Sequence, residues 1–278
     1  MAQMLFYENV TPVSPQRHGD LSVQISDYEF AGKVNSVPVM AAELPAAASD
    51  YTVVFAGNEE SVTPVVILGI EDGSNAYVGE DGVWSADYIP AFVRRYPFVF
   101  SQNEDKLILC VDENHEGCNR EGKGQRLFDD KGERTEYLSA MLRFLEESQT
   151  QFARTRTFCQ RLKDLDLLEP MQADITMPSG EKKSLRGFMV ISREKLKNLA
   201  PEKLAELVKT NELELAYIHL LSMNNFRRVI QKQAAGNVAA AAAAAVDAAP
   251  AEEAAPAEEA APAEEAAAAE EAADAGKE

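Results

Sequence analysis

Short runs of β-branched and aromatic residues, separated by turn residues, occupy the chain from about Leu21 to Asp112. Such runs predict strands, and those that are apolar at every position favour burial in the middle of a sheet. The residues before them, 1–20, are polar and rich in proline, and we expect an extended arm there. The clearest predicted strands are Tyr51–Ala56, Thr63–Ile70, Phe98–Ser101 and Lys106–Val111.

Two features between these strands predict further local structure. The small-residue stretch Met40–Ala48 is compatible with a short helix packed closely on the sheet. Asp81 and Gly82 form a turn signal between two short β runs, Ala76–Val78 and Val83–Ser85. An Asp-Gly pair between such runs predicts a small hairpin.

The second half of the chain changes to a helical period. From Thr135 to Leu162, apolar residues recur at the spacing of one helix face, which predicts a long amphipathic helix. Residues 172–177 and 182–191 are expected to form a hairpin around the turn Pro178-Ser179-Gly180. The other predicted helices are Arg193–Leu199, Pro201–Lys209 and Glu212–Lys232, the last one capped by Asn211.

This order of elements predicts an α+β fold, in which an N-terminal, mainly antiparallel or mixed β-sheet is covered by C-terminal helices. We expect residues 1–233 to form one domain with a single hydrophobic interior. From Ala234 onward the chain is almost entirely Ala, Glu and Pro. Such a composition cannot bury enough apolar surface to offset its ordering entropy, so we expect residues 234–278 to be a disordered acidic tail.

The charge of the chain argues against some classes of partner. The net charge is −19, and the tail, with eleven acidic residues and one lysine, accounts for −10 of it. An acidic body is poorly suited to nucleic acid or to anionic lipid, and we expect neither as a partner. Basic residues on the long helix alternate with acidic ones, which is typical of a solvated, ion-paired face. They are Arg143, Arg154, Arg156, Arg161 and Lys163.

The N-terminal residues, the apolar runs and the cysteines indicate the cellular compartment that we expect for this protein. The first residues lack a basic segment followed by an apolar run, so we expect no export signal. The longest apolar run, Val65–Ile70, is too short to span a bilayer. An odd number of cysteines in a chain without an export signal indicates reduced thiols, and we expect a cytoplasmic protein. The cysteines are Cys110, Cys118 and Cys159.

The block Gly82–Phe100 contains the only tryptophan, several further aromatic residues and the adjacent pair Arg94 and Arg95. It predicts a short helix that begins after a proline, ends at Tyr96 and leads into a buried strand. The two arginines face opposite sides of that helix, so at most one of them points into a cleft. We favour a structural arginine that pairs with a carboxylate or stacks on an aromatic ring. The alternative is an anion-binding arginine beside an aromatic shelf, suited to a peptide, nucleotide or sugar, formed by Trp84, Tyr88, Arg94, Arg95 and Tyr96.

A polar, glycine-rich stretch, residues 113–133, follows the last predicted strand and is longer than most connections in a compact domain. Asp112, Glu113, His115 and Cys118 form the densest cluster of candidate metal ligands or acid–base groups. No distant residue supplies the missing ligands at a recognised spacing, so we favour a solvated loop. We expect no metal and no cofactor.

The chain lacks the sequence motifs of nucleophile-elbow hydrolases, P-loop proteins, zinc proteases and CxxC proteins. Its three histidines are scattered at His18, His115 and His219. His219 has apolar neighbours, which favours a hydrogen-bonded core histidine over a ligand.

Several ordered blocks nevertheless resemble one family. VPVMAAELPAAASDYTVVF, PVVILGI, GVWSADYIPAFVRRYPFVF, LILCVDE, LFDDKGE, FCQRLKDLDLLEP, GFMVI and LELAYIHLLSM follow one another as they do in the SapC family of bacterial proteins. The resemblance covers about residues 1–233. It implies a soluble protein of Gram-negative bacteria whose relatives often occur beside TonB-dependent receptors. The family takes its name from a surface-layer locus, and the resemblance implies no catalytic residues.

The leading hypothesis is therefore a non-enzymatic accessory or binding protein that serves an envelope, surface-layer or TonB-dependent uptake system. Its ligand would be a protein, a peptide or a small molecule. Two alternatives stay open at this point. One is an enzyme of unrecognised type with a site near the loop Asp112–Cys118, and the other is a structural surface-layer component.

Overall fold

A computed structural model describes residues 5–58, 61–103, 106–177 and 180–247. Contacts within the chain divide it into two units, Met1–Ala240 and Ala241–Glu278. The fold described below is that of the first unit.

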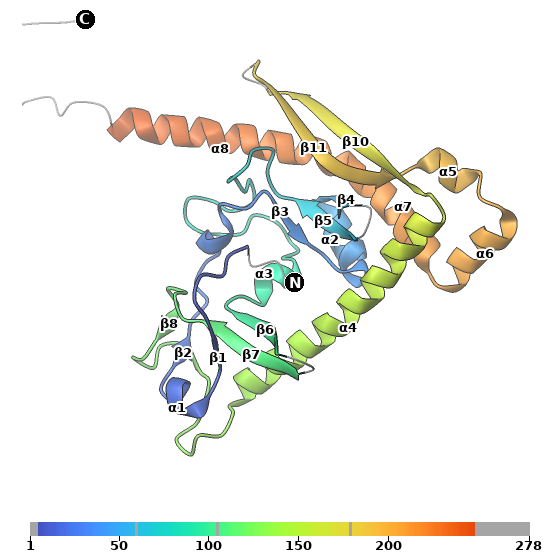
Figure 1. The fold of residues 1–278 in the computed structure, drawn as a ribbon. Coiled ribbons are helices and arrows are strands. Elements are labelled where there is room, and N and C mark those ends of the chain that lie inside the picture. Colours follow the sequence, from blue (N-terminus) through green and yellow to red (C-terminus); the bar gives the residue numbers. More distant parts are fainter. Residues whose placement is uncertain (1–4, 59–60, 104–105, 178–179, 248–278) are drawn as a thin grey trace, which may run out of the picture. The chain divides into compact units, whose positions relative to one another are not determined.

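Among the described residues, the strands form three sheets with antiparallel pairing (Figure 1). The largest has the order β10-β11-β4-β5-β3, made of Leu168–Thr176, Lys182–Ile191, Thr52–Gly57, Val62–Ile67 and Ser36–Pro38. The second has the order β1-β7-β6, made of Val10–Pro12, Lys106–Asp112 and Phe98–Asn103. The third has the order β8-β2-β9, made of Cys118–Asn119, Ser22–Val23 and Gln125–Arg126.

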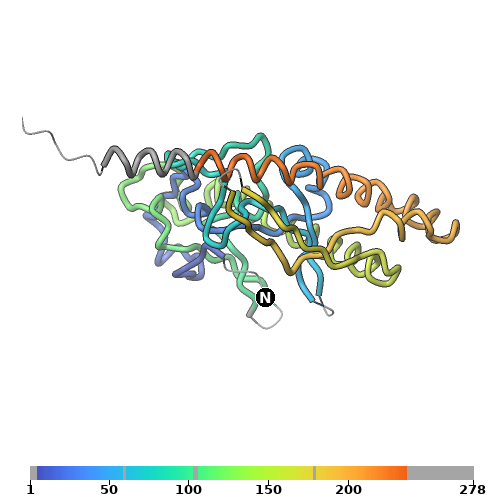
Figure 2. The backbone as a smooth tube through the Cα atoms, turned by 90° about the horizontal axis from the view of Figure 1, so that it is seen from above, coloured from blue at the N-terminus to red at the C-terminus, as the bar shows by residue number. Residues whose placement is uncertain are grey.

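Helices connect and flank these sheets. The α-helices are α1 Pro15–His18, α2 Leu44–Asp50, α3 Ala91–Arg94, α4 Glu136–Asp164, α5 Arg193–Lys197, α6 Pro201–Lys209, α7 Glu212–Ser222 and α8 Phe226–Asp247. Short 3-10 turns are η1 Glu29–Ala31, η2 Ala41–Glu43 and η3 Met223–Asn225. Seen from above, α5 and α6 lie at one end of this unit, away from the dark-blue residues of β1 and β2 (Figure 2).

Helix α4 joins the parts of the first unit. Thr135 caps its first turn, because the Thr135 hydroxyl accepts a hydrogen bond from the Leu138 amide at 3.3 Å. The helix contacts β6 and β9 of the two small sheets, and also β5 of the large sheet and the 3-10 turn η2 (Figure 1). Its buried face is regularly spaced, as one side of a helix requires, and includes Leu138, Leu145, Phe158, Cys159 and Leu162.

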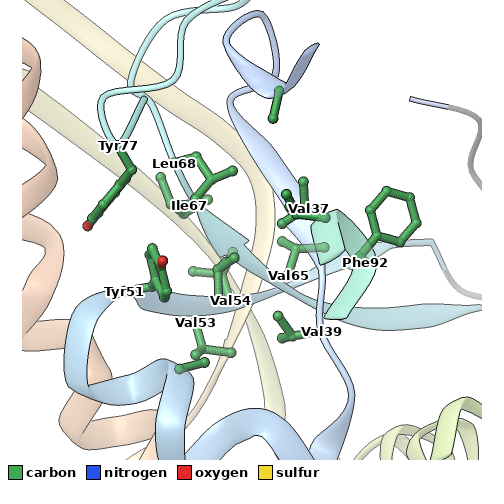
Figure 3. Packing of buried hydrophobic residues seen from close by; sticks show 14 of the residues in the cluster. Val37, Val39, Tyr51, Val53, Val54, Val65, Ile67, Leu68, Tyr77 and Phe92 are labelled. Atoms are coloured by element: carbon green, nitrogen blue, oxygen red, sulfur yellow. The ribbon is translucent and has the colours of Figure 1, made fainter. Parts of the chain in front are cut away.

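The hydrophobic interior consists of three clusters of buried residues. The largest lies around β3, β4 and β5 and takes in α3 and the start of α8. Figure 3 shows its centre, where valines of the three strands meet the rings of Tyr51, Tyr77 and Phe92. A second cluster lies where α4 and α7 cover β4 and β11, and a third joins the small sheets to the first half of α4.

The predicted α+β class is confirmed, with antiparallel sheets formed mainly by the N-terminal half and helices in the C-terminal half. The long helix, the hairpin β10–β11 and the four clearest strands lie where the hydrophobic pattern predicts them. The turn residues Pro178 and Ser179 of that hairpin lie outside the described residues. The expected hairpin at Asp81-Gly82 is reduced to a turn with one bridge, between Val78 and Trp84.

Three local expectations were wrong. Residues 5–18 are not an extended arm: Phe6, Tyr7 and His18 are buried, and β1 pairs with β7. The expected loop 113–133 contains β8 and β9, because both strands pair with β2. Asn211 does not cap α7 through its side chain and instead adopts a left-handed conformation with φ of 61°.

The C-terminal end also differs from expectation. The last predicted helix, Glu212–Lys232, is divided by η3, and its second part, α8, continues to Asp247, beyond the predicted helix end at Lys232. Alanine is the strongest helix former, which explains why residues 234–247 extend the helix rather than leave it. The rest of the expected acidic tail, residues 248–278, lies outside the described residues.

Candidate functional site

The block Gly82–Phe100 is built largely as its sequence indicates. Pro90 precedes the short helix α3, which ends at Arg94, and β6 begins at Phe98. The five candidate residues of this block do not form one site. They divide between two groups of contacts, one around Glu43 and Tyr51 and one around Asp112.

Trp84 belongs to the first group. Its Nε1 donates to the Tyr51 hydroxyl at 2.7 Å, and that hydroxyl donates to the Tyr88 carbonyl. The indole is 7% exposed and packs edge-on against Tyr28 at a centroid distance of 5.7 Å. Because its polar atom already has an internal partner, Trp84 supports the surrounding structure.

Tyr88 and Arg94 also belong to the first group. The Tyr88 hydroxyl donates to Glu43 Oε1 at 2.6 Å, and burial, together with this carboxylate, raises the pKa of Tyr88. The exposed guanidinium of Arg94 lies 5.7 Å from the Tyr88 ring and 5.3 Å from the Phe144 ring, and its Nε donates to the Ile89 carbonyl. Arg94 is therefore the stacked, structural arginine that one interpretation of the sequence expected.

Tyr96 lies in the second group, within a set of contacting rings that we call the aromatic block: Phe6, Tyr7, Phe30, Phe92 and Tyr96. The Tyr96 ring lies 4.3 Å from Phe30 and 5.1 Å from Tyr7, between centroids. Phe6 packs edge-on against Phe30, Phe92 and Tyr96. The Tyr96 ring also lies 5.0 Å from the His115 ring, so Tyr96 connects the two candidate regions of the sequence.

Arg95 is the buried member of the arginine pair, with 7% of its surface exposed. Its Cζ lies 3.9 Å from the centroid of the Phe92 ring and 5.8 Å from that of Tyr7. Its Nε and Nη2 atoms are both buried and have no hydrogen-bond partner. Arg95 thus places a charged group inside the aromatic block and leaves two of its donors open.

Asp112 is fully buried and has an anchoring role. Its carboxylate accepts hydrogen bonds from the backbone amides of Glu8, Asn9 and Asn114 at 2.7, 3.0 and 3.1 Å. The Tyr96 hydroxyl lies 3.4 Å from the same carboxylate. These contacts hold the N-terminal residues against the end of β7.

Glu113 is an ion-pairing residue. Its two carboxylate oxygens accept from Arg17 Nε at 2.7 Å and from Arg17 Nη2 at 2.6 Å. The Nδ1 of buried His18 accepts from the Ser14 amide, so its Nε2 carries the proton that is shared with Glu113 at 2.8 Å. The bond to Arg17 is the main cause that lowers the pKa of Glu113 to about 2.

His115 and Cys118 complete the loop. Burial lowers the pKa of His115, and its Nε2 is buried without a hydrogen-bond partner. Burial raises the pKa of Cys118 to about 11, which disfavours the reactive thiolate. Gly117 lets the loop approach the backbone of Gln24 closely, since a Cβ there would lie 1.8 Å from the Gln24 carbonyl oxygen.

Sequence reasoning missed three contributors to these contacts: Tyr7, Arg17 and His18. They lie in the part of the chain expected to be an extended arm, and their partners are 91 to 96 residues away in the sequence. The signal available in the sequence was Pro15, which can begin a helix, followed closely by Arg17 and His18. His219 was predicted correctly as a core histidine, because its Nε2 accepts from the Ile191 amide.

Within residues 5–247, apart from the gaps stated above, no helix is long and apolar enough to cross a membrane. In the same part of the chain, no group of three or more His, Cys, Asp or Glu side chains is placed to hold a metal ion.

The fold and these contacts define an α+β protein whose N-terminal residues close an aromatic block around a buried arginine. Comparison with family models assigns the family: the SapC model matches residues 13–229, and the chain belongs to the SapC family. No curated protein and no solved structure matched the chain.

Proposed function

We propose that this SapC-family chain is a non-enzymatic binding protein that acts in the cytoplasm and supports an envelope or uptake system. Its ligand site is the aromatic block around Arg95. The single observation behind the proposal is the guanidinium of Arg95, which is 7% exposed and has two buried donors, Nε and Nη2, without partners.

The physical argument concerns the cost of this arrangement. An arginine side chain stays charged at any physiological pH. Removing it from water costs several kcal/mol unless acceptors satisfy its donors. The Phe92 ring compensates part of that cost by stacking, but it offers no acceptor to Nε or Nη2. A charged group that is buried without internal acceptors is a feature expected at functional sites.

The neighbouring residues narrow the candidate site. Trp84, Tyr88 and Arg94 have internal partners and stabilise the region. Arg95, in contrast, stacks on the aromatic block, to which Tyr96 belongs. Tyr7, which sequence reasoning did not include, joins them. The site that we propose consists of Arg95, Tyr96 and Tyr7.

The loop that follows β7 supports the alternative hypothesis, an enzyme with its site in this loop, less well than it supports a structural role. The carboxylate of Asp112 accepts hydrogen bonds from three backbone amides. The carboxylate of Glu113 accepts hydrogen bonds from Nε and Nη2 of Arg17. Either group would have to leave these donors before it could act as a general base. The link to envelope or uptake systems rests on the context in which SapC-like proteins occur.

Co-purification tests the proposal. The full chain is isolated from its native cells, and its bound small molecules and proteins are identified by mass spectrometry beside the variants Arg95→Met and Arg94→Met. We expect a species that accompanies the wild-type chain and Arg94→Met and is lost with Arg95→Met. Equal recovery from all three chains would contradict the proposed site.

A further inference from the structure

The atoms that Arg95 leaves open define a specific geometry. Nε and Nη2 form one edge of the guanidinium, and two parallel N–H groups on this edge match the two oxygens of a carboxylate. The same chain shows this pairing elsewhere: Arg17 uses Nε and Nη2 to bind the two oxygens of Glu113 at 2.7 and 2.6 Å. Arg95 presents the same edge without an acceptor.

The nearby protein carboxylate does not fill this edge. Asp112 is close enough for its charge to act on Tyr7, as Arg95 does, yet among the described residues no ion pair joins Asp112 to Arg95. Its oxygens are already engaged by the amides of Glu8, Asn9 and Asn114. The Tyr7 hydroxyl also interacts with Arg95, but Nε and Nη2 have no hydrogen-bond partner among the described residues, so the acceptor for this edge would come from a ligand.

Charge favours a carboxylate over a phosphate. The guanidinium of Arg95 contacts the rings of Phe92 and Tyr7, and the buried Asp112 carboxylate acts on the Tyr7 hydroxyl together with Arg95. His115 adds no positive charge at neutral pH, because burial lowers its pKa. A single negative charge matches Arg95, whereas the second charge of a phosphate dianion would have no further cation among these groups to pair with it.

We propose that the Nε–Nη2 edge of Arg95 binds the carboxylate of a small organic acid or of a peptide C-terminus, with the rings of Phe92 and Tyr7 beside it. This inference rests on the proposed binding function and specifies the class of its ligand. The shared chemistry is a planar carboxylate carried by an apolar group, because the side chains around Arg95 that such a group would contact are aromatic.

A ligand reaches Arg95 only if a covering group moves, because the residue is almost fully buried. Residues 5–9, which we call the N-terminal strap, contain no helix or strand, and Tyr7 in this strap lies beside the guanidinium. Hydrogen bonds hold the strap. The Tyr7 hydroxyl donates to the Phe98 carbonyl, and the amides of Glu8 and Asn9 donate to the Asp112 carboxylate. In the opening that we propose, these contacts are released, the strap moves aside to admit the ligand, and it then closes again with Tyr7 beside the bound carboxylate, while β1 stays paired with β7.

Calorimetric titration of the full chain tests the inference. The probes are benzoate and N-acetyl-Gly-Phe, each compared with its neutral amide, and phenyl phosphate. We expect at least one carboxylate to bind, with its amide at least about 10-fold weaker, because the charge-assisted pair is lost. Arg95→Met should weaken binding by about 10-fold or more, Arg95→Lys should also weaken it because lysine lacks the fork, and Arg94→Met should leave it unchanged.

The outcomes separate this inference from the proposed function. Binding of benzoate alone identifies a small acid, and binding of the dipeptide alone identifies a peptide C-terminus. If neither carboxylate binds, if the amides bind equally well, or if only phenyl phosphate binds, the carboxylate inference is wrong. If the co-purifying species still depends on Arg95 in that case, the binding function stands; if it does not, both fail.

Discussion

Arg94 and Arg95 are chemically identical neighbours with opposite environments. Arg94 is exposed, stacks on Tyr88 and Phe144 and donates to a backbone carbonyl. Arg95 is buried, and two of its donors are open. At the scale of single residues, the function that we propose depends on that difference, because buried donors without acceptors gain most from an acceptor on a ligand.

His219 provides a prediction at this scale. Burial lowers its pKa from 6.5 to about 4, so between these values the unfolded chain binds a proton that the folded chain does not. The free energy of unfolding should be fully present above pH 6.5 and should fall, by up to about 3 kcal/mol, as the pH falls towards 4. Urea unfolding at a series of pH values measures this.

The variant His219→Gln is the matched control, because glutamine keeps an acceptor for the Ile191 amide and does not titrate. It should lose the part of the slope between pH 6.5 and 4 that His219 causes. The pKa of Glu113, lowered from 4.5 to about 2, affects stability as the pH falls below about 4.5, at the acid end of that window, and it does so equally in both chains. A slope identical in the two chains would show that His219 is not the cause.

At the scale of elements, the N-terminal strap and β7 depend on each other. Asp112, the last residue of β7, holds the amides of Glu8 and Asn9, and β1 then continues the contact by pairing with β7. Hydrogen bonds of the strap involve the side chains of Tyr7 and Asp112, and pairing within a sheet begins only after the strap, at β1. Such a segment can open locally while the rest of the fold stays intact.

The variant Asp112→Asn tests this anchor. Asparagine offers one acceptor oxygen in place of two and turns an N–H group towards an amide, so the strap should loosen at a cost of about 1–3 kcal/mol. Hydrogen exchange of the Glu8 and Asn9 amides should become about 10-fold faster or more. The exposed Asp164→Asn serves as control, and unchanged exchange at Glu8 and Asn9 would contradict the anchoring role.

Local periodicity explains how much of the architecture could be predicted. Helix α4 follows from its apolar spacing, and β4 to β7 follow from their runs of β-branched residues, because these signals are contained within each segment. The pairing of Arg17 with Glu113 joins residues 96 apart, and no local pattern encodes it. The sequence also indicates that Arg94 and Arg95 face different sides, but tertiary packing decides which of them is buried.

At the scale of the whole molecule, the first turns of α8 are part of the interior. Val229 is 1% exposed and lies in the main hydrophobic cluster, and Ile230 packs against it. Gln233 and Ser74 are joined by a side-chain hydrogen bond of 2.8 Å. The domain therefore needs the end of the SapC-matched region, residues 13–229, and the turn that follows it.

Truncation tests this requirement. A chain that ends after Ala240 should unfold at the same temperature as the full chain and in one transition. A chain that ends after Asn225 loses Val229, Ile230 and Gln233, and its free energy of unfolding should fall by about 2–5 kcal/mol. Equal thermal stability of the two truncated chains, or two separate transitions, would contradict a single interior that includes α8.

The central claim is that the fold buries Arg95 without satisfying it and reserves its open edge for a ligand. The most direct test is the free energy of unfolding of ligand-free Arg95→Met, measured in urea beside Arg161→Met. Arg161 has an internal partner, Glu212, at 2.7 Å, so its loss should cost about 1–3 kcal/mol. Arg95→Met should stay within about 1 kcal/mol of the wild-type chain or exceed it, because a buried charge without acceptors is removed and methionine packs well against aromatic rings. A loss as large as that of Arg161→Met would show that Arg95 is a structural residue and would contradict the claim.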